Sequence, residues 1–209
     1  MTNMPSQCSF LLDIDPNARG LIFDLDGTLI NTMDLHYNAW KEVGEKFGFE
    51  YPEELFYRLA GTPTRKIVPI LNETFGLSLD VEKTTAEKEN AFLRHIDEIH
   101  IIEPVAAIAR KYHGILPMAV GTGNTRKLTE MLLEVSGLKK YFAVVITADD
   151  VVHHKPHPET FLLCAQKMNV SPQLCQVFED GDAGLEAARS GGMIATDVRP
   201  FVFNGAAQN

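Results

Sequence analysis

The spacing of apolar residues changes twice along the chain, near residue 32 and again near residue 100. Before the first change, the run GLIFD that begins at Gly20 is apolar, β-branched and aromatic, which is typical of a buried strand. Between the two changes, apolar residues recur at three- and four-residue spacing, which predicts helices without a strand signal of comparable strength. The expected helices lie within MDLHYNAWKEVGEKFG, PEELFYRLAG, TRKIVPILNETFG and DVEKTTAEKENAFLRHIDEI, with ends expected at Gly48, Gly61 and Gly76.

After residue 100, short strand-like runs alternate with helical ones. The strands are expected in PMAVGTG, AVVITADD, LCQVFED and MIATDV, and the helices in PVAAIARKYHG, TRKLTEMLLEVSG, PETFLLCAQKMN and AGLEAARSGG. Such alternation predicts a parallel sheet covered by helices on both faces. We therefore expect a doubly wound, Rossmann-like α/β core domain formed by residues 1–31 and 101–209, with residues 32–100 as an inserted helical domain. Residues 1–18, which are polar and contain two prolines, are expected to be a loose lead-in.

Composition and charge narrow the class of protein. Of the 209 residues, 45% are hydrophobic and 22% are charged, as in an ordinary globular protein. The formal net charge of −9 argues against nucleic acid or an anionic membrane as the main partner, because both are held by basic surfaces. The sequence contains neither a run of about 20 apolar residues nor a basic, apolar N-terminal signal, so a cytoplasmic location is expected. The three cysteines, Cys8, Cys164 and Cys175, form no CxxC pair and are expected to be reduced thiols.

Polar residues follow four of the expected strands, close to the point where each strand ends. They are Asp24, Asp26 and Thr28 after the first, Gly121, Thr122, Gly123 and Asn124 after the second, Lys155 in the loop after the third, and Glu179, Asp180 and Asp182 after the fourth. In an open parallel sheet, ligands bind outside the carboxyl ends of the strands. These four strand ends are therefore expected to form one site.

The acidic side chains in this set predict a Mg²⁺ site. Several like charges at one edge of a sheet repel each other unless a cation lies among them. Oxygen ligands without an organised set of histidines or cysteines suit Mg²⁺, which takes its remaining ligands from water and a substrate phosphate. The glycine-rich turn at 121–123 offers backbone N–H groups to a phosphate, and Lys155 would neutralise a phosphate oxygen or a carboxylate. This set fits phosphoryl transfer through an aspartyl-phosphate.

The same residues resemble the haloacid dehalogenase superfamily of phosphohydrolases. The four motifs of that family occur in order, as DLDGT at 24–28, Thr122 in VGTGN, Lys155 in KPHP, and Glu179-Asp180 in FEDGDAG. The resemblance implies that Asp24 is the nucleophile and Asp26 the general acid and base. It also implies that Thr122 hydrogen-bonds the transferred phosphoryl group. N-capping of the following helix is the other interpretation of this threonine, and the two are compatible.

The resemblance further implies a set of ligands for Mg²⁺ and a set of substrate contacts. The expected metal ligands are Asp24, Asp26 through its backbone carbonyl, Asp180, and Glu179 directly or through water. Asp182 is left out, because an acid at a helix N-terminus also suits the helix dipole. The expected substrate-binding residues are Thr28, His36, Arg65, Gly123 and Asn124.

Within the inserted segment, NTMDLHYNAW resembles the small cap domain of the β-phosphoglucomutase-like subfamily, with Thr32, His36 and Trp40 at its entry. The resemblance implies that His36 pairs with the general acid and helps to close the cap, while an exposed histidine on an amphipathic helix is the alternative. PMAVGTG, HHKP and TFLLCAQ resemble bacterial sugar-phosphate phosphatases that act on fructose 1-phosphate. We therefore expect a monomeric phosphatase for a small phosphorylated metabolite.

Two other functions share the core motifs, an isomerase of the β-phosphoglucomutase type and a catalytically silent sensor of a phosphorylated ligand. The mutases carry a cap arginine that grips a second phosphate, whereas LAGTPTRK places Thr64 at that position and Arg65 one residue later. This difference favours hydrolysis, and the intact set of acids and Lys155 argues against the sensor. The histidines of VVHHKPHP (His153, His154 and His157) are expected to form a polar loop, because no zinc-ligand spacing accompanies them.

Overall fold

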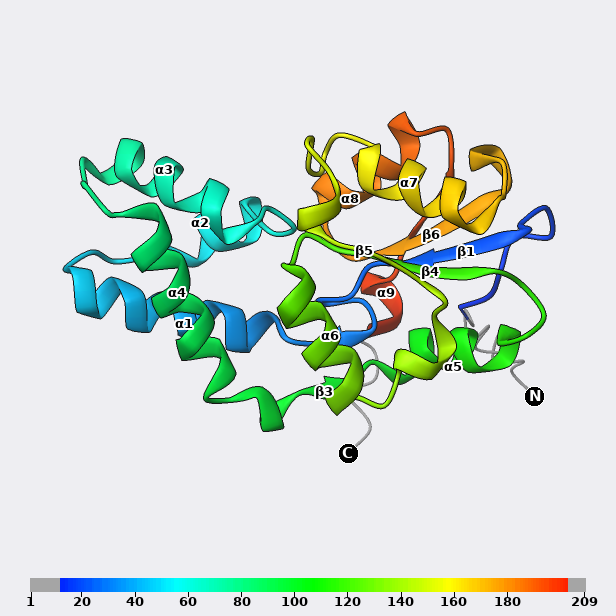
Figure 1. Cartoon of the computed structure of the whole chain (residues 1–209), viewed down its shortest axis with the longest axis horizontal. Coiled ribbons are helices and arrows are strands. Elements are labelled where there is room, and N and C mark those ends of the chain that lie inside the picture. The colour runs from blue at the N-terminus through cyan, green and yellow to red at the C-terminus, as the bar shows by residue number, and fades with distance from the viewer. Residues whose placement is uncertain (1–11, 203–209) are drawn as a thin grey trace, which may run out of the picture.

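The centre of the molecule is a five-stranded parallel sheet with the strand order β5-β4-β1-β6-β7 (Figure 1). The computed structural model describes residues 12–202. Its sheet consists of β1 (Gly20–Phe23), β4 (Met118–Gly121), β5 (Val144–Ile146), β6 (Cys175–Glu179) and β7 (Ile194–Asp197). The predicted α/β fold is thereby confirmed, and β1 lies at the middle of the sheet.

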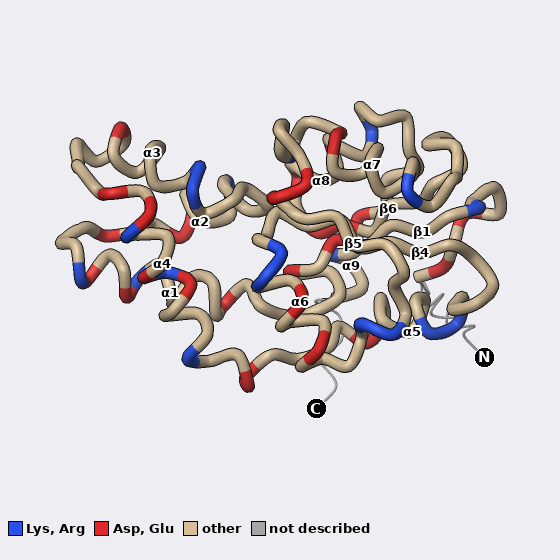
Figure 2. The backbone as a smooth tube through the Cα atoms, viewed as in Figure 1, with Lys and Arg blue, Asp and Glu red and all other residues tan. Residues whose placement is uncertain are grey.

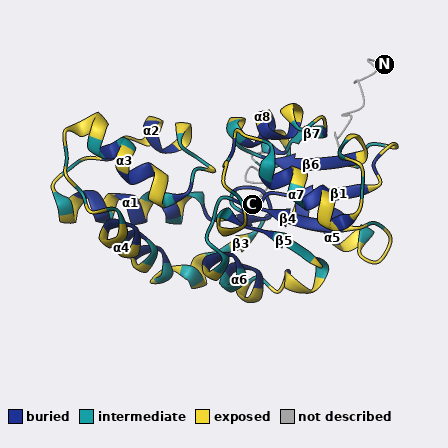
Figure 3. Cartoon of the chain, turned by 45° about the horizontal axis from the view of Figure 1, so that its top comes forward, coloured by how far each residue is buried: buried dark blue, intermediate teal, exposed yellow. Residues whose placement is uncertain are grey.

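Helices cover both faces of the sheet, as the alternation of strands and helices predicts. They are α5 (Glu103–Tyr112), α6 (Arg126–Val135), α7 (Glu159–Met168), α8 (Asp182–Ser190) and the short α9 (Arg199–Val202). Because successive side chains of a strand point to opposite faces, Leu21 and Phe23 pack in the cluster that contains α5 and α6. Ile22 packs in the cluster that contains α7 and α8. Figure 3 shows the central strands β1, β4 and β6 as buried and the outer faces of these helices as exposed.

The inserted segment forms four helices that lie to one side of the sheet (Figure 1). They are α1 (Met33–Phe47), α2 (Glu53–Arg58), α3 (Thr64–Phe75) and α4 (Val81–Leu93). These helices share an apolar cluster of their own, in which the rings of Trp40 and Tyr51 stack with centroids 5.2 Å apart. Gly48 and Gly76 end α1 and α3 as expected. The expectation for Gly61 is wrong, because α2 already ends at Arg58.

The two segments that connect the α/β part to the insertion form a short two-stranded ribbon. Strand β2 (Ile30–Asn31) runs antiparallel to β3 (His100–Ile101). Two residues in each strand are too few for a hydrophobic alternation to develop, so the sequence pattern missed this ribbon. It brings the start of α1 and the end of the insertion together beside β1. The domain limits at residues 32 and 100 stay a prediction.

The described part of the lead-in is packed, which corrects the expectation of a loose segment. Ala18 is buried in the main core, and Leu12 and Ile14 pack against it. The backbone N–H of Asp15 donates a hydrogen bond to the side-chain oxygen of Gln176 in β6, at 2.7 Å. Residues 1–11, including Cys8, lie outside the described residues.

The surface charge and the thiols are those of an ordinary globular protein. Figure 2 shows Lys and Arg together with Asp and Glu on both the helical insertion and the α/β part. Cys164 and Cys175 are buried free thiols. Among residues 12–202, no helix is long and apolar enough to cross a membrane.

Candidate active site

Lys155 lies between two carboxylates at the carboxyl end of the sheet. Its Nζ is 2.5 Å from Oδ1 of Asp24, which follows β1, and 2.8 Å from Oε1 of Glu179 at the end of β6. The Lys155 side chain is only 1% exposed. Burial by itself lowers the pKa of the ammonium group, but the two carboxylates outweigh it and raise that pKa above its usual value. Lys155 is therefore a permanent positive charge in the site.

Three carboxylates lie near Lys155, and together they can carry more negative charge than its single positive charge neutralises. Oxygens of Asp24, Glu179 and Asp180 all lie within 4.8 Å of one another. Burial raises the pKa of Asp24 well above its usual range, and Lys155 offsets this only in part, because Glu179 and Asp180 raise it further. Burial, followed by the charge of Glu179, raises the pKa of Asp180 to about 7. A cluster of oxygen donors with surplus negative charge fits a hard divalent cation such as Mg²⁺.

Glu179 differs from Asp24 and Asp180 in its hydrogen-bond partners. Its Oε1 accepts from Lys155, and its Oε2 accepts from the backbone N–H of Gly181 at 2.5 Å. Both oxygens of Glu179 already accept hydrogen bonds, so this carboxylate is better suited to contact a metal ion through a water molecule than to bind it directly. Asp182 is 87% exposed at its side chain and pairs with Arg199, so its omission from the metal set agrees with its position.

Asp180 is held by the turn that follows β1. The hydroxyl of Thr28 donates to Oδ1 of Asp180 at 2.9 Å, and Thr28 is fully buried, so its expected contact with substrate stays a prediction. Gly27 has φ +76°, and a Cβ there would lie 2.2 Å from Oδ2 of Asp180. The DGT sequence thus provides both the left-handed turn and the space that the carboxylate of Asp180 needs.

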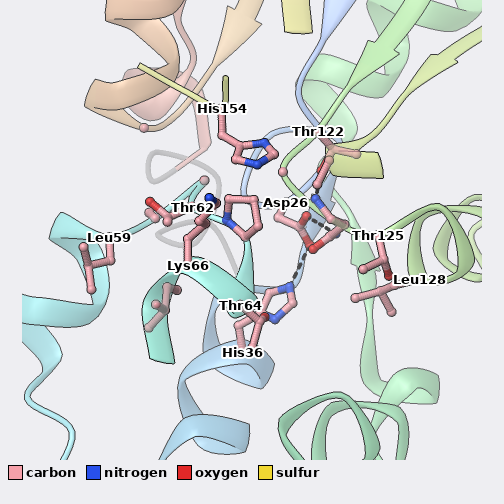
Figure 4. Close-up of a pocket in the computed structure, with 18 of the residues that line it drawn as sticks. Asp26, His36, Leu59, Thr62, Thr64, Lys66, Thr122, Thr125, Leu128 and His154 are labelled. Atoms are coloured by element: carbon pink, nitrogen blue, oxygen red, sulfur yellow. Dashed lines mark hydrogen bonds and ion pairs between the residues drawn. The ribbon is translucent and has the colours of Figure 1, made fainter. Parts of the chain in front are cut away.

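Asp26 faces a different set of partners. Its Oδ1 lies 3.0 Å from Nε2 of His36 (Figure 4). The same oxygen accepts from the hydroxyl of Thr32 at 2.5 Å, and Oδ2 accepts from Nδ2 of Asn124 at 2.5 Å. Burial by itself raises the pKa of Asp26, but the imidazole of His36 and the bonds from His36 and Thr32 lower it overall. The pKa values of Asp24 and Asp26 therefore shift in opposite directions, as separate roles require.

His36 is buried, so its interpretation as an exposed histidine is wrong. Its ring stacks on Phe92 of α4 with centroids 4.3 Å apart. On its other side, Nζ of Lys88 in α4 lies 2.5 Å from Nδ1, and an ammonium group can only donate such a bond. His36 then keeps its proton on Nε2, which faces Asp26.

Lys88 is a site residue that sequence reasoning missed. It is only 4% exposed, and burial lowers its pKa to about 8 in spite of the charges of Asp26 and Glu89. Burial and the neighbouring Lys88 likewise lower the pKa of His36. In the sequence, Lys88 is one of several charged residues of an amphipathic helix. Only the packing of α4 on α1 separates it from the solvated lysines.

The loop after β4 supplies the opposite wall. Thr122 is 1% exposed, and its hydroxyl accepts from the backbone N–H of Asn124 at 3.2 Å. The N-cap of α6 is Thr125, so the alternative interpretation of Thr122 as that cap is wrong. Gly123 meets the insertion directly, because a Cβ there would lie 2.3 Å from the carbonyl oxygen of Gly61. The loop between α2 and α3 thus closes against the core at Gly123.

A cavity lies between this loop and the strand ends. In Figure 4, Leu59, Thr62, Thr64 and Lys66 of the insertion stand on one side, Thr122, Thr125 and Leu128 stand on the other, and Asp26 and His36 lie between. The insertion also contributes Met33, Trp40, Phe56, Ile67, Thr85, Lys88 and Glu89 to the lining. Arg65 lines it as well, but its Nη2 binds Glu82 at 2.5 Å and its side chain is 61% exposed.

Comparison with known proteins agrees with this geometry. The sequence profile described as haloacid dehalogenase-like hydrolase matches residues 21–198. The chain belongs to this family. Fructose-1-phosphate phosphatase YqaB of Escherichia coli is 44% identical over 181 residues, which cover 86% of this chain and 96% of that protein. A phosphorylated carbohydrates phosphatase of Thermotoga maritima is 34% identical over 177 residues, which cover 83% of this chain and 81% of that one.

Solved structures give the same result. The structure of β-phosphoglucomutase from Clostridium difficile matches with a TM-score of 0.77 at 25% identity, over 86% of this chain and 84% of that one. The predicted superfamily and the β-phosphoglucomutase-like architecture are therefore confirmed. With phosphatases among its relatives, the hydrolase is a phosphoric monoester hydrolase, as predicted.

In this hydrolase, Lys88→Met is expected to lower kcat about 10- to 100-fold, because the variant loses the donor that orients His36 toward Asp26. It should also change the pH profile. In the unmodified enzyme, the Lys88 ammonium loses its proton as the pH rises through about 8, so activity should fall there. Lys88→Met has no such group, and its profile should lack this alkaline limb. The measurement is kcat between pH 6 and pH 10 with a saturating phosphate ester.

The matched control for that variant is Lys83→Met. Lys83 is exposed on the same helix, so its replacement should leave both kcat and the pH profile unchanged. An alkaline limb that persists unaltered in Lys88→Met would contradict the orienting role of this lysine.

Gly123→Ala is expected to lower kcat/KM, because the added methyl group would hold the insertion away from the core. The added Cβ would lie 2.3 Å from the carbonyl oxygen of Gly61, a backbone atom that cannot yield without movement of the whole loop. We expect kcat/KM to fall about tenfold or more, with little change in the midpoint of thermal unfolding. Steady-state kinetics and calorimetry test this pair of results, and an unchanged kcat/KM would show that closure at Gly123 is dispensable.

Proposed function

We propose that the hydrolase is a Mg²⁺-dependent phosphatase that acts on small sugar phosphates, with fructose 1-phosphate as the leading candidate, through an aspartyl-phosphate on Asp24. The observation that carries this proposal is the placement of Asp24, bound to Lys155, close to a second carboxylate, Asp26, which has its own partners and an oppositely shifted pKa. The identity of 44% to a fructose-1-phosphate phosphatase supports the choice of substrate.

In the first step, an oxygen of Asp24 attacks phosphorus and the bond from phosphorus to the sugar oxygen breaks. Lys155 and the hydroxyl of Thr122 bind the oxygens of the transferred group, while Asp26 gives a proton to the departing sugar oxygen. The bound phosphate raises the pKa of Asp26 by its negative charge. Asp26 receives its proton from Nε2 of His36, and Lys88 replaces that proton at Nδ1.

In the second step, water attacks phosphorus and releases phosphate from Asp24. Asp26, now a carboxylate, takes the proton of that water, which explains why its pKa is kept low. The Nδ2 group of Asn124 donates to Asp26 at 2.5 Å and holds the carboxylate in place through both steps. Asp26 then returns the proton taken from water to Nε2 of His36, and the Nδ1 proton of His36 returns to Lys88, so each of these groups regains its starting charge.

Mg²⁺ would be held by Asp24, Asp180 and the backbone carbonyl of Asp26, with Glu179 acting through water. When bound, it supplies positive charge to the phosphoryl oxygens and keeps Asp24 and Asp180 ionised. The raised pKa values of Asp24 and Asp180, caused first by burial and then by the neighbouring carboxylates, support this assignment, because a bound cation would offset both causes.

The insertion selects the leaving group in this proposal. The wall that the insertion supplies is apolar at Trp40 and Phe56 and includes Thr62, a composition that suits the apolar faces and polar edges of a sugar. Arg65, expected to bind substrate, lines the cavity and is paired with Glu82. Thr64 stands where the mutases carry the arginine that holds a second phosphate, which favours hydrolysis over isomerisation.

The test is phosphate release from a panel of esters in the presence of Mg²⁺. The panel contains fructose 1-phosphate, glucose 6-phosphate, β-glucose 1-phosphate, phosphoglycolate and a nucleoside monophosphate. We expect the highest kcat/KM on a sugar phosphate, and loss of release when a chelator removes the metal. Activity on the nucleotide alone would refute the substrate class, and conversion of β-glucose 1-phosphate without release would replace the phosphatase by an isomerase. Binding of these esters without turnover would favour a sensor.

We also propose that the enzyme works as a cytoplasmic monomer without a nucleic-acid or membrane partner. The net charge of −9 supports the absence of nucleic-acid and membrane partners, because a strongly acidic protein repels both polyanions and anionic bilayers. Light scattering coupled to size-exclusion chromatography tests the expected monomer.

A further inference from the structure

Three metal-ligating side chains come together on the surface next to Lys155. One ligand atom each from His153, His157 and Glu159 lies within 4.8 Å of the other two. The two imidazole rings have their centroids 4.6 Å apart. The histidines belong to the loop HHKPHP, and Glu159 is the first residue of α7. The sequence pattern predicts only a polar loop here, because the acid that completes the group belongs to the following helix.

Hydrogen bonds within the protein fix the position of the Glu159 carboxylate. It accepts from the backbone N–H of Val152 at 3.0 Å, from the backbone N–H of His153 at 2.9 Å, and lies 2.8 Å from Nδ1 of the His153 ring. These bonds, with that from Val152 first, lower the pKa of Glu159 to about 2. The group is therefore an ionised ligand at neutral pH, joined to the same loop as the histidines.

We propose that His153, His157 and Glu159 bind one Zn²⁺ ion, or a divalent cation of similar ligand preference, at a site separate from the acidic cluster of the active site. Two imidazoles and one carboxylate are the ligand set of zinc rather than of Mg²⁺, which prefers oxygen alone. Ligand atoms around a tetrahedral zinc lie roughly 3.4 Å apart for bonds of about 2.1 Å. The present separations, 2.8 Å between His153 and Glu159 and at most 4.8 Å overall, require only small side-chain movements.

The surroundings leave these side chains free to move. The His153 side chain is 64% exposed, so water can complete the coordination shell. His157 has one long hydrogen bond, in which its Nδ1 accepts from the backbone N–H of Glu159 at 3.3 Å, and a metal ion can displace it. A bound ion would cross-link the loop of Lys155 to the start of α7.

The experiment is equilibrium dialysis of the full chain, without a histidine tag, against micromolar Zn²⁺. Millimolar Mg²⁺ is present throughout to occupy the acidic cluster. We expect one equivalent of bound zinc in the unmodified protein and an affinity at least about tenfold weaker in His157→Ala, which loses a ligand. His157→Ala is preferred to a Glu159 variant, because Glu159 also holds the loop backbone.

His95→Ala is the matched control. His95 also lies beside carboxylates, with Nδ1 2.7 Å from Glu98 and Nε2 3.8 Å from Glu42, but it has no histidine partner there. Its replacement should leave zinc binding unchanged. Equal binding by the unmodified protein and His157→Ala, or equal loss in both variants, would overturn the proposal. Dialysis needs no turnover, so the result does not depend on the proposed phosphatase activity.

Discussion

Asp24→Asn is expected to lower kcat for phosphate release by at least about 10⁴-fold, because an amide oxygen cannot form the aspartyl-phosphate. The same change should leave the fold intact or slightly more stable. Burial raises the pKa of Asp24, which means that its ionised form is disfavoured in the native state, and a neutral isostere removes that penalty. Phosphate release and chemical unfolding of the same preparation separate the two effects.

Asp182→Asn provides the matched control for this variant. Asp182 belongs to the same acidic stretch of sequence, but its side chain is 87% exposed and turned to Arg199. Its replacement should change kcat less than about twofold. Substantial phosphate release by Asp24→Asn would show that another group performs the attack, and would remove the basis for the proposed two-step mechanism.

Lys155→Met is expected to have the largest effect on stability among the site residues. The variant keeps the side-chain length but leaves Asp24 and Glu179 buried without their shared cation. Removing one partner of a buried ion pair lowers the free energy of unfolding by about 3–5 kcal/mol. Activity should be lost as well, because Lys155 no longer neutralises the phosphoryl group.

The pH dependence of Lys155→Met distinguishes this cause from a packing defect. In the folded state of Lys155→Met, Asp24 lacks the lysine that lowers its pKa. The folded variant therefore binds protons more readily than the unfolded chain. The stability deficit should therefore shrink as the pH falls from 7 toward 5. Urea unfolding at several pH values measures this trend. Lys167→Met, at an exposed position on α7, should show neither the loss nor the trend. A deficit that is constant with pH would contradict the electrostatic explanation.

The core of the site could be predicted from the sequence because topology does most of the assembly. Asp24, Lys155 and Asp180 are far apart in the chain, but each follows a strand of a parallel sheet, and the carboxyl ends of such strands meet at one edge. Strand β1 could be recognised from GLIFD because its residues are buried on both faces and therefore almost wholly apolar. Local pattern and global arrangement agree at these positions.

Other features depended on helix packing, which leaves no periodic signal in the chain. In the sequence, Lys88 is a charged residue of an amphipathic helix like the exposed Lys83, and only the contact of α4 with α1 buries it against His36. Arg65 gives another example, since the sequence does not show that it lines the cavity while paired with Glu82. Thr28 likewise bonds to Asp180, a partner 152 residues away.

The sequence by itself therefore determined the fold class, the family and the acids and lysine at the strand ends, because strand composition and motif order are local properties. The tertiary structure alone decided which partners each acid has, and hence that the pKa of Asp24 rises while that of Asp26 falls. It also decided that the loop at Gly61 meets Gly123 and that Glu159 joins His153 and His157. The physical reason is that burial, charge and hydrogen bonding act through space over a few ångströms, between residues whose separation along the chain carries no information about that distance.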